Sequence, residues 1–123
     1  MMDVMERDAA IFPIRELHYE NFYYRCICGG KVYAHAQIQI DGSVAMIHLY
    51  MQRWGSRVLA EMRNDFEFIK TLLKAKGVWR LVGTHTIVGA DKWVKFLRLL
   101  GFRLVFNSCL PDGVPCAMAL MEI

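Results

Sequence analysis

The segment from Met51 to Arg57 carries residue types that bind phosphate. It reads Met-Gln-Arg-Trp-Gly-Ser-Arg, after an almost fully apolar stretch and before a stretch with helical periodicity. A strand that passes through a glycine-containing loop into a helix aims backbone N–H groups and the positive end of the helix dipole at one spot. Arg53 and Arg57 flank that spot. The segment therefore indicates a phosphate or pyrophosphate site, although a glycine chosen only for a turn explains it equally well.

Cysteine and histidine side chains offer a second chemistry, metal binding. Cys26-x-Cys28 places two thiols on one strand face, and the other possible ligands are His35, Cys109 and Cys116. Zinc sites usually hold Cys-x2-4-Cys pairs in tight turns, and a Cys-x-Cys pair on a flat strand lacks that geometry. We therefore expect no metal site, and we expect the thiols to act as small buried hydrophobic groups.

The formal net charge of +3 is unevenly distributed. Residues 52–103 carry eleven Lys and Arg against four Asp and Glu, a net of +7, whereas the remainder carries a net of −4. Such polarity suits an anionic ligand on one half of the fold, and equally a solvated basic helix face. Nucleic acid is an unlikely partner because Trp54, Phe66, Trp93 and Phe96 lie on apolar faces instead of among the basic residues.

Three antiparallel strands are expected first: the first is rich in aromatic and β-forming residues, and the third is almost fully apolar. The second of them alternates apolar and polar side chains, which predicts one buried face. Glycine turns, Gly29-Gly30 and Asp41-Gly42, separate the strands. The strands are predicted at residues 21–28, 31–40 and 43–51.

The period then changes to that of a helix, with Ser56 as the expected N-cap and Gly77 as the stop. A further strand, a second helix and a final pair of strands follow. The predicted class is α/β (α+β), a mixed, mainly antiparallel sheet in the order β-β-β-α-β-α-β-β. These later elements are predicted at residues 78–86, 91–100, 103–108 and 116–123.

Size and composition limit the class of protein. The 123 residues, 55% of them hydrophobic, fit one domain spanning residues 1–123. No apolar stretch approaches the roughly 20 residues of a membrane-spanning helix. The early acidic residues and the missing apolar region argue against a secretory signal, so we expect a cytoplasmic protein with reduced thiols.

Two motifs carry a family resemblance. Gln52-x-x-Gly55 lies in the strand-to-helix loop, and residues 93–102 read Trp-Val-Lys-Phe-Leu-Arg-Leu-Leu-Gly-Phe. With the order of the elements, they resemble the GCN5-related N-acetyltransferase (GNAT) superfamily over about residues 22–123. The ending of the second helix also resembles compact phage-encoded members. Residues 1–20 then form an abbreviated amino-terminal segment, in which residues 12–19 are the candidate first strand.

The resemblance implies binding of acetyl-coenzyme A (acetyl-CoA). Its pyrophosphate would lie on the backbone of residues 53–58. Its pantetheine arm would lie along residues 49–51, where the third and fourth predicted strands splay apart. The implied cofactor-binding residues are Leu49, Tyr50, Met51, Gln52, Arg53, Trp54, Gly55, Ser56, Arg57 and Val58.

The activity that the resemblance implies is direct transfer of an acetyl group to an amine, with a side chain accepting the amine proton. No carboxylate occurs between Asp41 and Glu61, so His48 is the first candidate for the base and His85 the second. A histidine that makes one structural hydrogen bond is the competing explanation for each. Across the hairpin, His48 could also pair with His35.

Two positions depart from the family pattern. Arg57 stands where a small residue is usual, and Leu97 stands where the family often has a tyrosine that acts as the general acid. Together with the short amino terminus, they favour an alternative: a catalytically inactive GNAT-fold binding protein or a phage virion-associated protein, located in the host cytoplasm or the virion.

The acceptor amine is not identified by the sequence, because the segment that would build its pocket is the one most reduced. A homodimer is expected, since a small domain so rich in apolar residues can cover its open sheet with a second copy. No membrane partner is expected.

Overall fold

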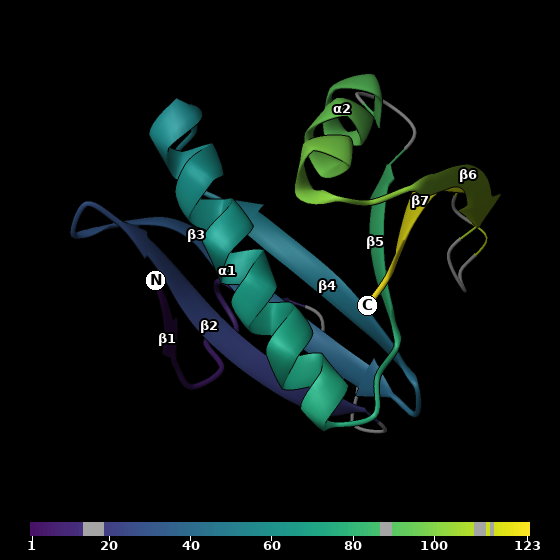
Figure 1. The fold of residues 1–123 in the computed structure, drawn as a ribbon, viewed down its shortest axis with the longest axis horizontal. Helices are drawn as coiled ribbons and strands as arrows, with labels where there is room; N and C mark the ends of the chain where they lie inside the picture. The colour runs from purple at the N-terminus through teal and green to yellow at the C-terminus, as the bar shows by residue number, and fades with distance from the viewer. Residues whose placement is uncertain (14–18, 87–89, 110–112, 114) are drawn as a thin grey trace.

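The computed structural model describes residues 1–13, 19–86, 90–109, 113 and 115–123, with the backbone alone at 85, 86, 90–92, 104–106 and 108. Two helices and the strands of one sheet are formed in the described part (Figure 1). They are β1 (Met2–Val4), β2 (Glu20–Cys28), β3 (Lys31–Asp41), β4 (Val44–Met51), α1 (Ser56–Ala75), β5 (Arg80–Thr86), α2 (Ala90–Leu100), β6 (Leu104–Cys109) and β7 (Pro115–Glu122).

The strands form one seven-stranded sheet in the order β1-β2-β3-β4-β5-β7-β6. All neighbours are antiparallel except β4 and β5, which α1 connects as a parallel crossover. The predicted class, a mixed and mainly antiparallel sheet with two principal helices, is confirmed.

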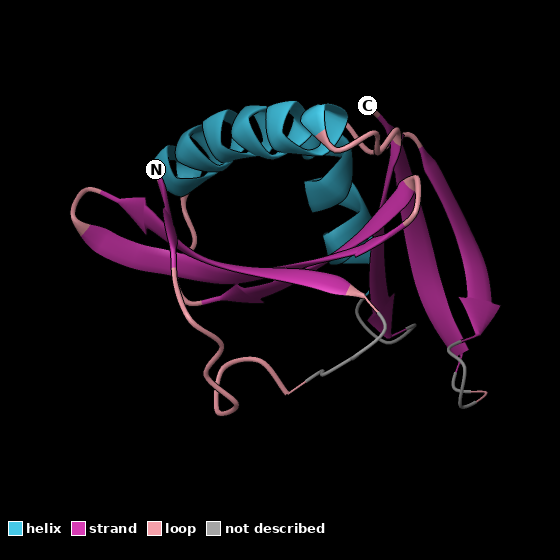
Figure 2. Ribbon diagram, turned by 90° about the horizontal axis from the view of Figure 1, so that it is seen from below, coloured by secondary structure: helices cyan, strands magenta, loops and turns pink. Residues whose placement is uncertain are grey.

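Both helices pack on the same side of the sheet. Figure 2 shows α1 lying along one face of the amino-terminal strands, while α2 stands against the strands at the other end. The helices meet where the Arg63 Nε donates to the Leu99 carbonyl at 3.3 Å and where the Phe66 and Phe102 rings lie 6.1 Å apart. One hydrophobic core therefore fills the space between the sheet and the two helices.

The sheet begins with a strand that the sequence did not reveal. Met2–Val4 pairs with residues 24–26 of β2. The prediction of a first strand at residues 12–19 was wrong at Phe12, which lies outside the strands. Residues 14–18 of that prediction lie outside the described residues. Three residues are too few to show a period of two. Phe12 is instead fully buried on the sheet face opposite the helices, against the rings of Tyr23, His35 and Tyr50.

The expectation of one buried face on β3 was also wrong. Gln37 and Gln39, on the face opposite the helices, are 0% and 1% exposed. In Figure 2 the loop after β1 lies on that side of the sheet, where Phe12 packs against Tyr23, His35 and Tyr50. β3 also contains a bulge: the register with β2 shifts between Cys26 and Ile27, and Tyr33 is the extra residue.

Candidate functional site

The loop between β4 and α1 is tied to β3 by its backbone. The N–H groups of Gln52 and Arg53 both donate to the carbonyl of Tyr33, at 2.7 and 3.1 Å. Gly55 follows with φ +147°, a conformation that side-chain-bearing residues rarely adopt. The loop therefore reaches α1 along a path that depends on both the β3 bulge and a glycine.

The helix begins one residue earlier than predicted. Gly55, not Ser56, is the N-cap, and no side chain caps the helix. The first N–H groups of a helix have no partner within the helix. In α1 the first N–H that bonds within the helix is that of Leu59, which donates to the Gly55 carbonyl at 2.9 Å. The N–H groups before it are available to a ligand. The first turn also contains no acidic residue. This end of α1 is thus suited to an anion.

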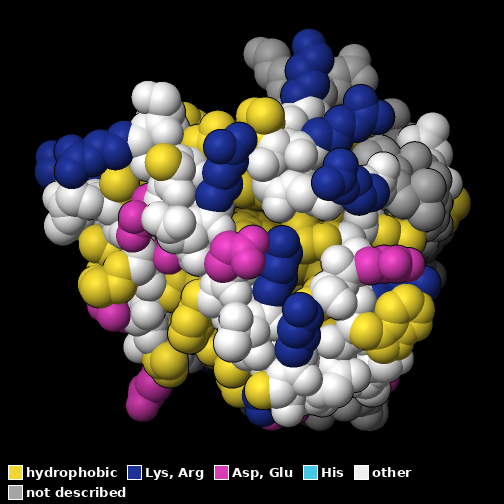
Figure 3. Space-filling view, in the orientation of Figure 1, with side chains coloured by type: hydrophobic (Ala, Val, Ile, Leu, Met, Phe, Trp, Pro, Cys, Tyr) yellow, Lys and Arg dark blue, Asp and Glu magenta, His cyan; other side chains and the backbone are white. Residues whose placement is uncertain are grey.

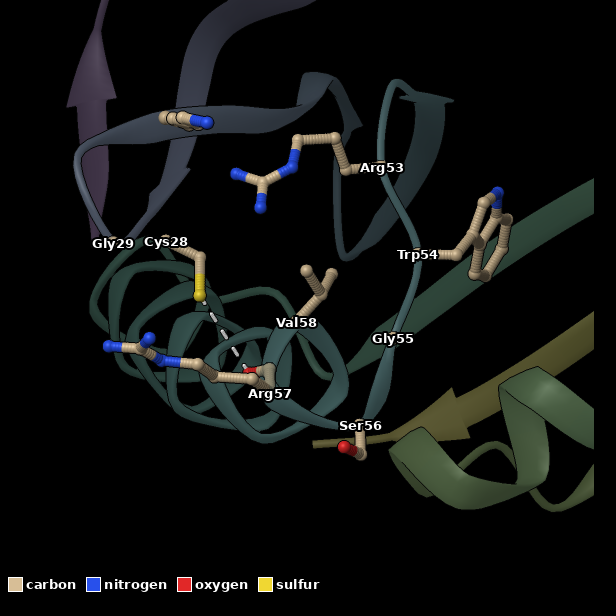
Figure 4. Close-up of a pocket in the computed structure, with 9 residues that line it drawn as sticks. Cys28, Gly29, Arg53, Trp54, Gly55, Ser56, Arg57 and Val58 are labelled. Carbon is tan, nitrogen blue, oxygen red and sulfur yellow. Dashed lines mark hydrogen bonds between the residues drawn. The ribbon is translucent and has the colours of Figure 1, made fainter.

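A pocket of about 380 Å³ opens at this end of the helix. One wall is the β4–α1 loop and the first turn of α1, and the other is the β2–β3 hairpin (Figure 4). The lining residues are Cys28, Gly29, Lys31, Arg53, Trp54, Gly55, Ser56, Arg57 and Val58. Six of the predicted cofactor-binding residues, 53–58, are therefore brought together in one pocket.

Three cationic side chains line this pocket, namely Lys31, Arg53 and Arg57. The Arg57 guanidinium extends to the hairpin: a Cβ added at Gly29 would lie 3.9 Å from its Cζ. Figure 4 shows Arg53 reaching in from the opposite side. The sequence analysis did not identify Lys31 as a residue of this site. Lys31 reaches the pocket only because the β2–β3 hairpin lies beside the start of α1.

Four other predicted cofactor-binding residues lie outside the pocket, in β4 and just after it. The pairing of β4 with β5 runs only from Val44 opposite Arg80 to Ile47 opposite Gly83. Beyond that point β4 continues through Leu49, Tyr50 and Met51 to Gln52, paired only with β3. The predicted splaying of the two strands is therefore present beside the pocket.

On the helix side of this splay, α2 packs closely on β5. A Cβ added at Gly83 would lie 3.5 Å from Trp93 Cζ2 and 3.7 Å from Leu97 Cδ1. Leu97 is 3% exposed. Leu97 stands where the family often has a tyrosine. Its side chain is packed in apolar surroundings and has no proton to donate.

His48 lies on the opposite face of β4, because Ala45 and Ile47 face the core. Its Nε2 is 2.8 Å from Gln39 Oε1, and burial lowers the pKa of its ring from the ordinary 6.5. The suggested pairing with His35 was wrong, because His48 lies opposite Gln37 and His35 opposite Tyr50.

His85, the second candidate base, is placed only by its backbone. It lies in β5 opposite Ala117, and its side chain lies outside the description.

The helix face of the molecule is rich in basic side chains. Figure 3 shows Lys and Arg side chains exposed over the upper part of this face and also in its centre, with separate Asp and Glu side chains among and below them. Within the described residues, no group of three or more His, Cys, Asp or Glu could hold a metal ion. In the same part of the chain, no helix is long and apolar enough to span a bilayer.

Comparison with known proteins finds similarity in structure. No protein-family model matches the chain, and no curated protein matches it in sequence. The structure of an IAA acetyltransferase from Bacillus cereus ATCC 14579 is similar with a TM-score of 0.69 at 11% identity, covering 100% of this chain and 99% of that one. A GNAT family acetyltransferase from Elizabethkingia anophelis with acetyl-CoA bound gives 0.69 at 11%, covering 100% and 97%.

The aminoglycoside acetyltransferase AAC(6')-Ib, in complex with paromomycin and acetyl-CoA, gives a TM-score of 0.65 at 14% identity. This chain aligns over 83% of its own length and spans 64% of that enzyme. Together with the sheet order, the parallel crossover through α1 and the splayed β4 and β5, these similarities show that the chain has the fold of the GNAT acetyltransferases.

Proposed function

We propose that this protein is an acetyl-CoA-dependent N-acetyltransferase that transfers the acetyl group directly to an amine. The observation that carries the proposal is the uncapped start of α1, surrounded by Lys31, Arg53 and Arg57 and placed beside the β4–β5 splay. Acetyl-CoA, which the Elizabethkingia anophelis structure contains, supplies an activated acetyl thioester and carries phosphates that match these cations.

The residues around the pocket fit the phosphates of such a ligand. Backbone N–H groups of Ser56, Arg57 and Val58 are free of intrahelical partners, and no carboxylate is among the described residues that line the pocket. The Arg57 guanidinium lies toward Gly29 and leaves the helix end open. The segment of β4 from Leu49 to Met51 would hold the pantetheine arm where pairing with β5 has ended.

His48 would serve as the general base. Burial lowers the pKa of its ring, so the imidazole is neutral at physiological pH and has a lone pair to accept a proton. His85, in the strand across the splay, is the second candidate. Leu97 offers no proton, so we expect solvent to protonate the released thiolate.

Leu97 also favours a second candidate function, a protein that binds a CoA ligand without turnover. In that case the pocket would bind the cofactor, and no amine would be acetylated at a measurable rate. Binding and turnover must therefore be measured separately.

The test combines both measurements. Thermal unfolding with increasing acetyl-CoA should raise the midpoint progressively, because ligand binds the folded state. Thiol release would then be measured with amines that include aminoglycosides and peptides with an amino-terminal alanine, the acceptors of structural neighbours. No midpoint shift at millimolar acetyl-CoA contradicts the proposal. Binding without thiol release for any amine favours the second candidate.

The base assignment has its own control. His48→Gln should lower turnover by about 100-fold or more, whereas His35→Gln, on the same sheet face, should not. Unchanged turnover in the His48 variant would remove it from the mechanism.

We further propose a homodimer in the cytoplasm. The short edge strand β1 exposes Val4, whose side chain is 79% accessible, and an unpaired strand edge can be covered by a second copy. All four cysteines are free, which suits a reducing compartment. Light scattering after size-exclusion chromatography should give twice the 14.2 kDa of one chain, and a mass of one chain would exclude the dimer.

A further inference from the structure

The sheet face opposite the helices carries a buried polar row that the packing of the core does not require. His35, Gln37 and Gln39 alternate along β3 on this face, and both glutamines are almost inaccessible. Burying an amide costs free energy unless its donors and acceptor are all bonded. An apolar residue at these positions would avoid that cost, so the two amides need a separate explanation.

The Nε2 of Gln37 donates to Asn21 Oδ1 on the neighbouring strand β2 at 3.1 Å. Gln39 reaches diagonally across the β3–β4 ladder instead. Its backbone pairs with Met46, yet its Oε1 lies 2.8 Å from Nε2 of His48. The Nε2 of Gln39 is buried without a partner among the described groups. Its amide therefore makes the bond to His48 while leaving a donor unsatisfied.

The bond determines which ring nitrogen of His48 carries hydrogen. A carbonyl oxygen only accepts, so the His48 Nε2 that faces it must carry the proton, and the lone pair is on Nδ1. An amide also adds no charge beside the ring. A carboxylate in its place would favour the protonated imidazolium, which cannot act as a base.

We propose that Gln39 is a positioning residue that fixes the orientation and tautomer of His48, so that Nδ1 accepts the proton of the acceptor amine. The inference rests on the proposed role of His48 as the base. In that step the amine nitrogen bonds to the acyl carbon, the carbon–sulfur bond breaks with its electron pair passing to sulfur, and the amine proton moves to Nδ1. The resulting imidazolium keeps its Nε2–H bond to Gln39.

Other titratable groups on this face must be considered in any pH measurement. On β5, strand alternation puts Thr84 on the same sheet face as His48, and a threonine does not titrate. Burial is the cause that lowers the pKa of His48. Among the described residues, the titratable or charged groups of this face and of the segment covering it include Asp3, Arg7, Asp8, Tyr23, Arg25, His35, Tyr50, Arg80 and Glu122.

The first test reads the tautomer directly and needs no activity. Long-range ¹H–¹⁵N NMR of the full chain, with the His48 signals assigned by their loss in His48→Gln, should show hydrogen on Nε2 at neutral pH. Gln39→Met should give a mixture of tautomers, while the matched buried variant Gln37→Met should not. Hydrogen on Nδ1 in the wild type, or an unchanged ring in Gln39→Met, would overturn the proposal.

The second test measures turnover. Gln39→Met should lower kcat roughly ten-fold or more with the KM for acetyl-CoA unchanged, as found for groups that orient a functional histidine. Gln39→Glu should move the acidic limb of the kcat/KM profile to higher pH. Equal losses in the Gln39 and Gln37 variants without any change in the pH profile would overturn the inference.

The two tests also separate this inference from the proposed function. A tautomer fixed by Gln39, together with normal turnover in His48→Gln, would reject His48 as the base and with it the catalytic part of the inference. Loss of turnover in His48→Gln with no effect of Gln39 variants would reject Gln39 alone.

Discussion

At the scale of single residues, Arg57 shows how a long side chain fits beside an anion site. Its backbone belongs to the first turn of α1, and its guanidinium lies at the β2–β3 hairpin near Gly29. The thiol of Cys28 contacts the Arg57 carbonyl at 3.8 Å, which links the same two walls. In the proposed site, Arg57 would therefore contact a phosphate from the side of the hairpin.

Replacing Arg57 tests this arrangement. Arg57→Ala should raise the Kd for coenzyme A roughly ten-fold, because a hydrogen bond to a charged group contributes about 1.5–3 kcal/mol. Isothermal titration calorimetry at two salt concentrations measures the change, and the variant should depend less on salt. Lys70→Ala, whose amine pairs with Glu67 in the middle of α1, is the control. Tighter binding by Arg57→Ala would show that this side chain obstructs the pocket.

Gly55 is the residue on which the entry to α1 depends. Its φ of +147° and ψ of 168° lie in a region that is essentially restricted to glycine. Gly55→Ala should lower the free energy of unfolding by about 1–3 kcal/mol, measured by urea titration. Gly42→Asn is the control, because its φ of +59° lies in the left-handed region that asparagine tolerates. Equal losses in the two variants would contradict a special conformation at Gly55.

At the scale of elements, the β3 bulge joins the sheet to α1. Tyr33, the extra residue, donates its hydroxyl to Asp65 on α1, and burial raises the pKa of that hydroxyl. Asp65 is 5% exposed, and it also pairs with the Met1 amine at 2.9 Å. Burial likewise raises the pKa of the neighbouring Cys26 thiol to about 12, so this thiol stays protonated.

Removing the hydroxyl should expose the importance of this contact. Tyr33→Phe leaves a buried carboxylate with one partner fewer and should cost about 1–3 kcal/mol of unfolding free energy. A double-mutant cycle with Asp65→Asn isolates the pair, because the second change should cost less in the Tyr33→Phe background. Additive losses would show that the hydroxyl and the carboxylate contribute independently.

The elements also show what a sequence can and cannot predict. The alternation of β3, the glycine turns and the helical period of α1 are local patterns, and such patterns predicted the two helices, the strands from β2 onward and their order, but not β1. The bulge at Tyr33, the burial of Gln37 and the approach of Lys31 depend on segments distant in sequence. Six pocket residues were predicted because they are consecutive, whereas Cys28, Gly29 and Lys31 come from another hairpin.

At the scale of the whole molecule, the sheet has two unlike faces. One packs against both helices, and the other is covered by the segment around Phe12. Two histidines of the second face, His35 and His48, have pKa values lowered by burial. Folding therefore favours the neutral form of both rings.

This burial predicts how stability depends on pH. Below the ordinary histidine pKa of 6.5 the unfolded chain binds protons that the folded His48 resists, so stability falls as the pH falls through 6.5. Urea unfolding at pH 7.5 and 5.5 should show this loss, and His48→Gln should show a smaller one. Since carboxylates titrate equally in both proteins, an identical loss in the variant would contradict the prediction.

The bulge at Tyr33 has a consequence for the length of the chain. The same residue supplies the carbonyl that receives Gln52 and Arg53 and the hydroxyl that binds Asp65. A one-residue deletion there would restore regular pairing between β2 and β3 and remove both attachments at once. The residue count of this hairpin is therefore constrained, because the β4–α1 loop, which we propose to bind phosphate, is hydrogen-bonded to the bulge.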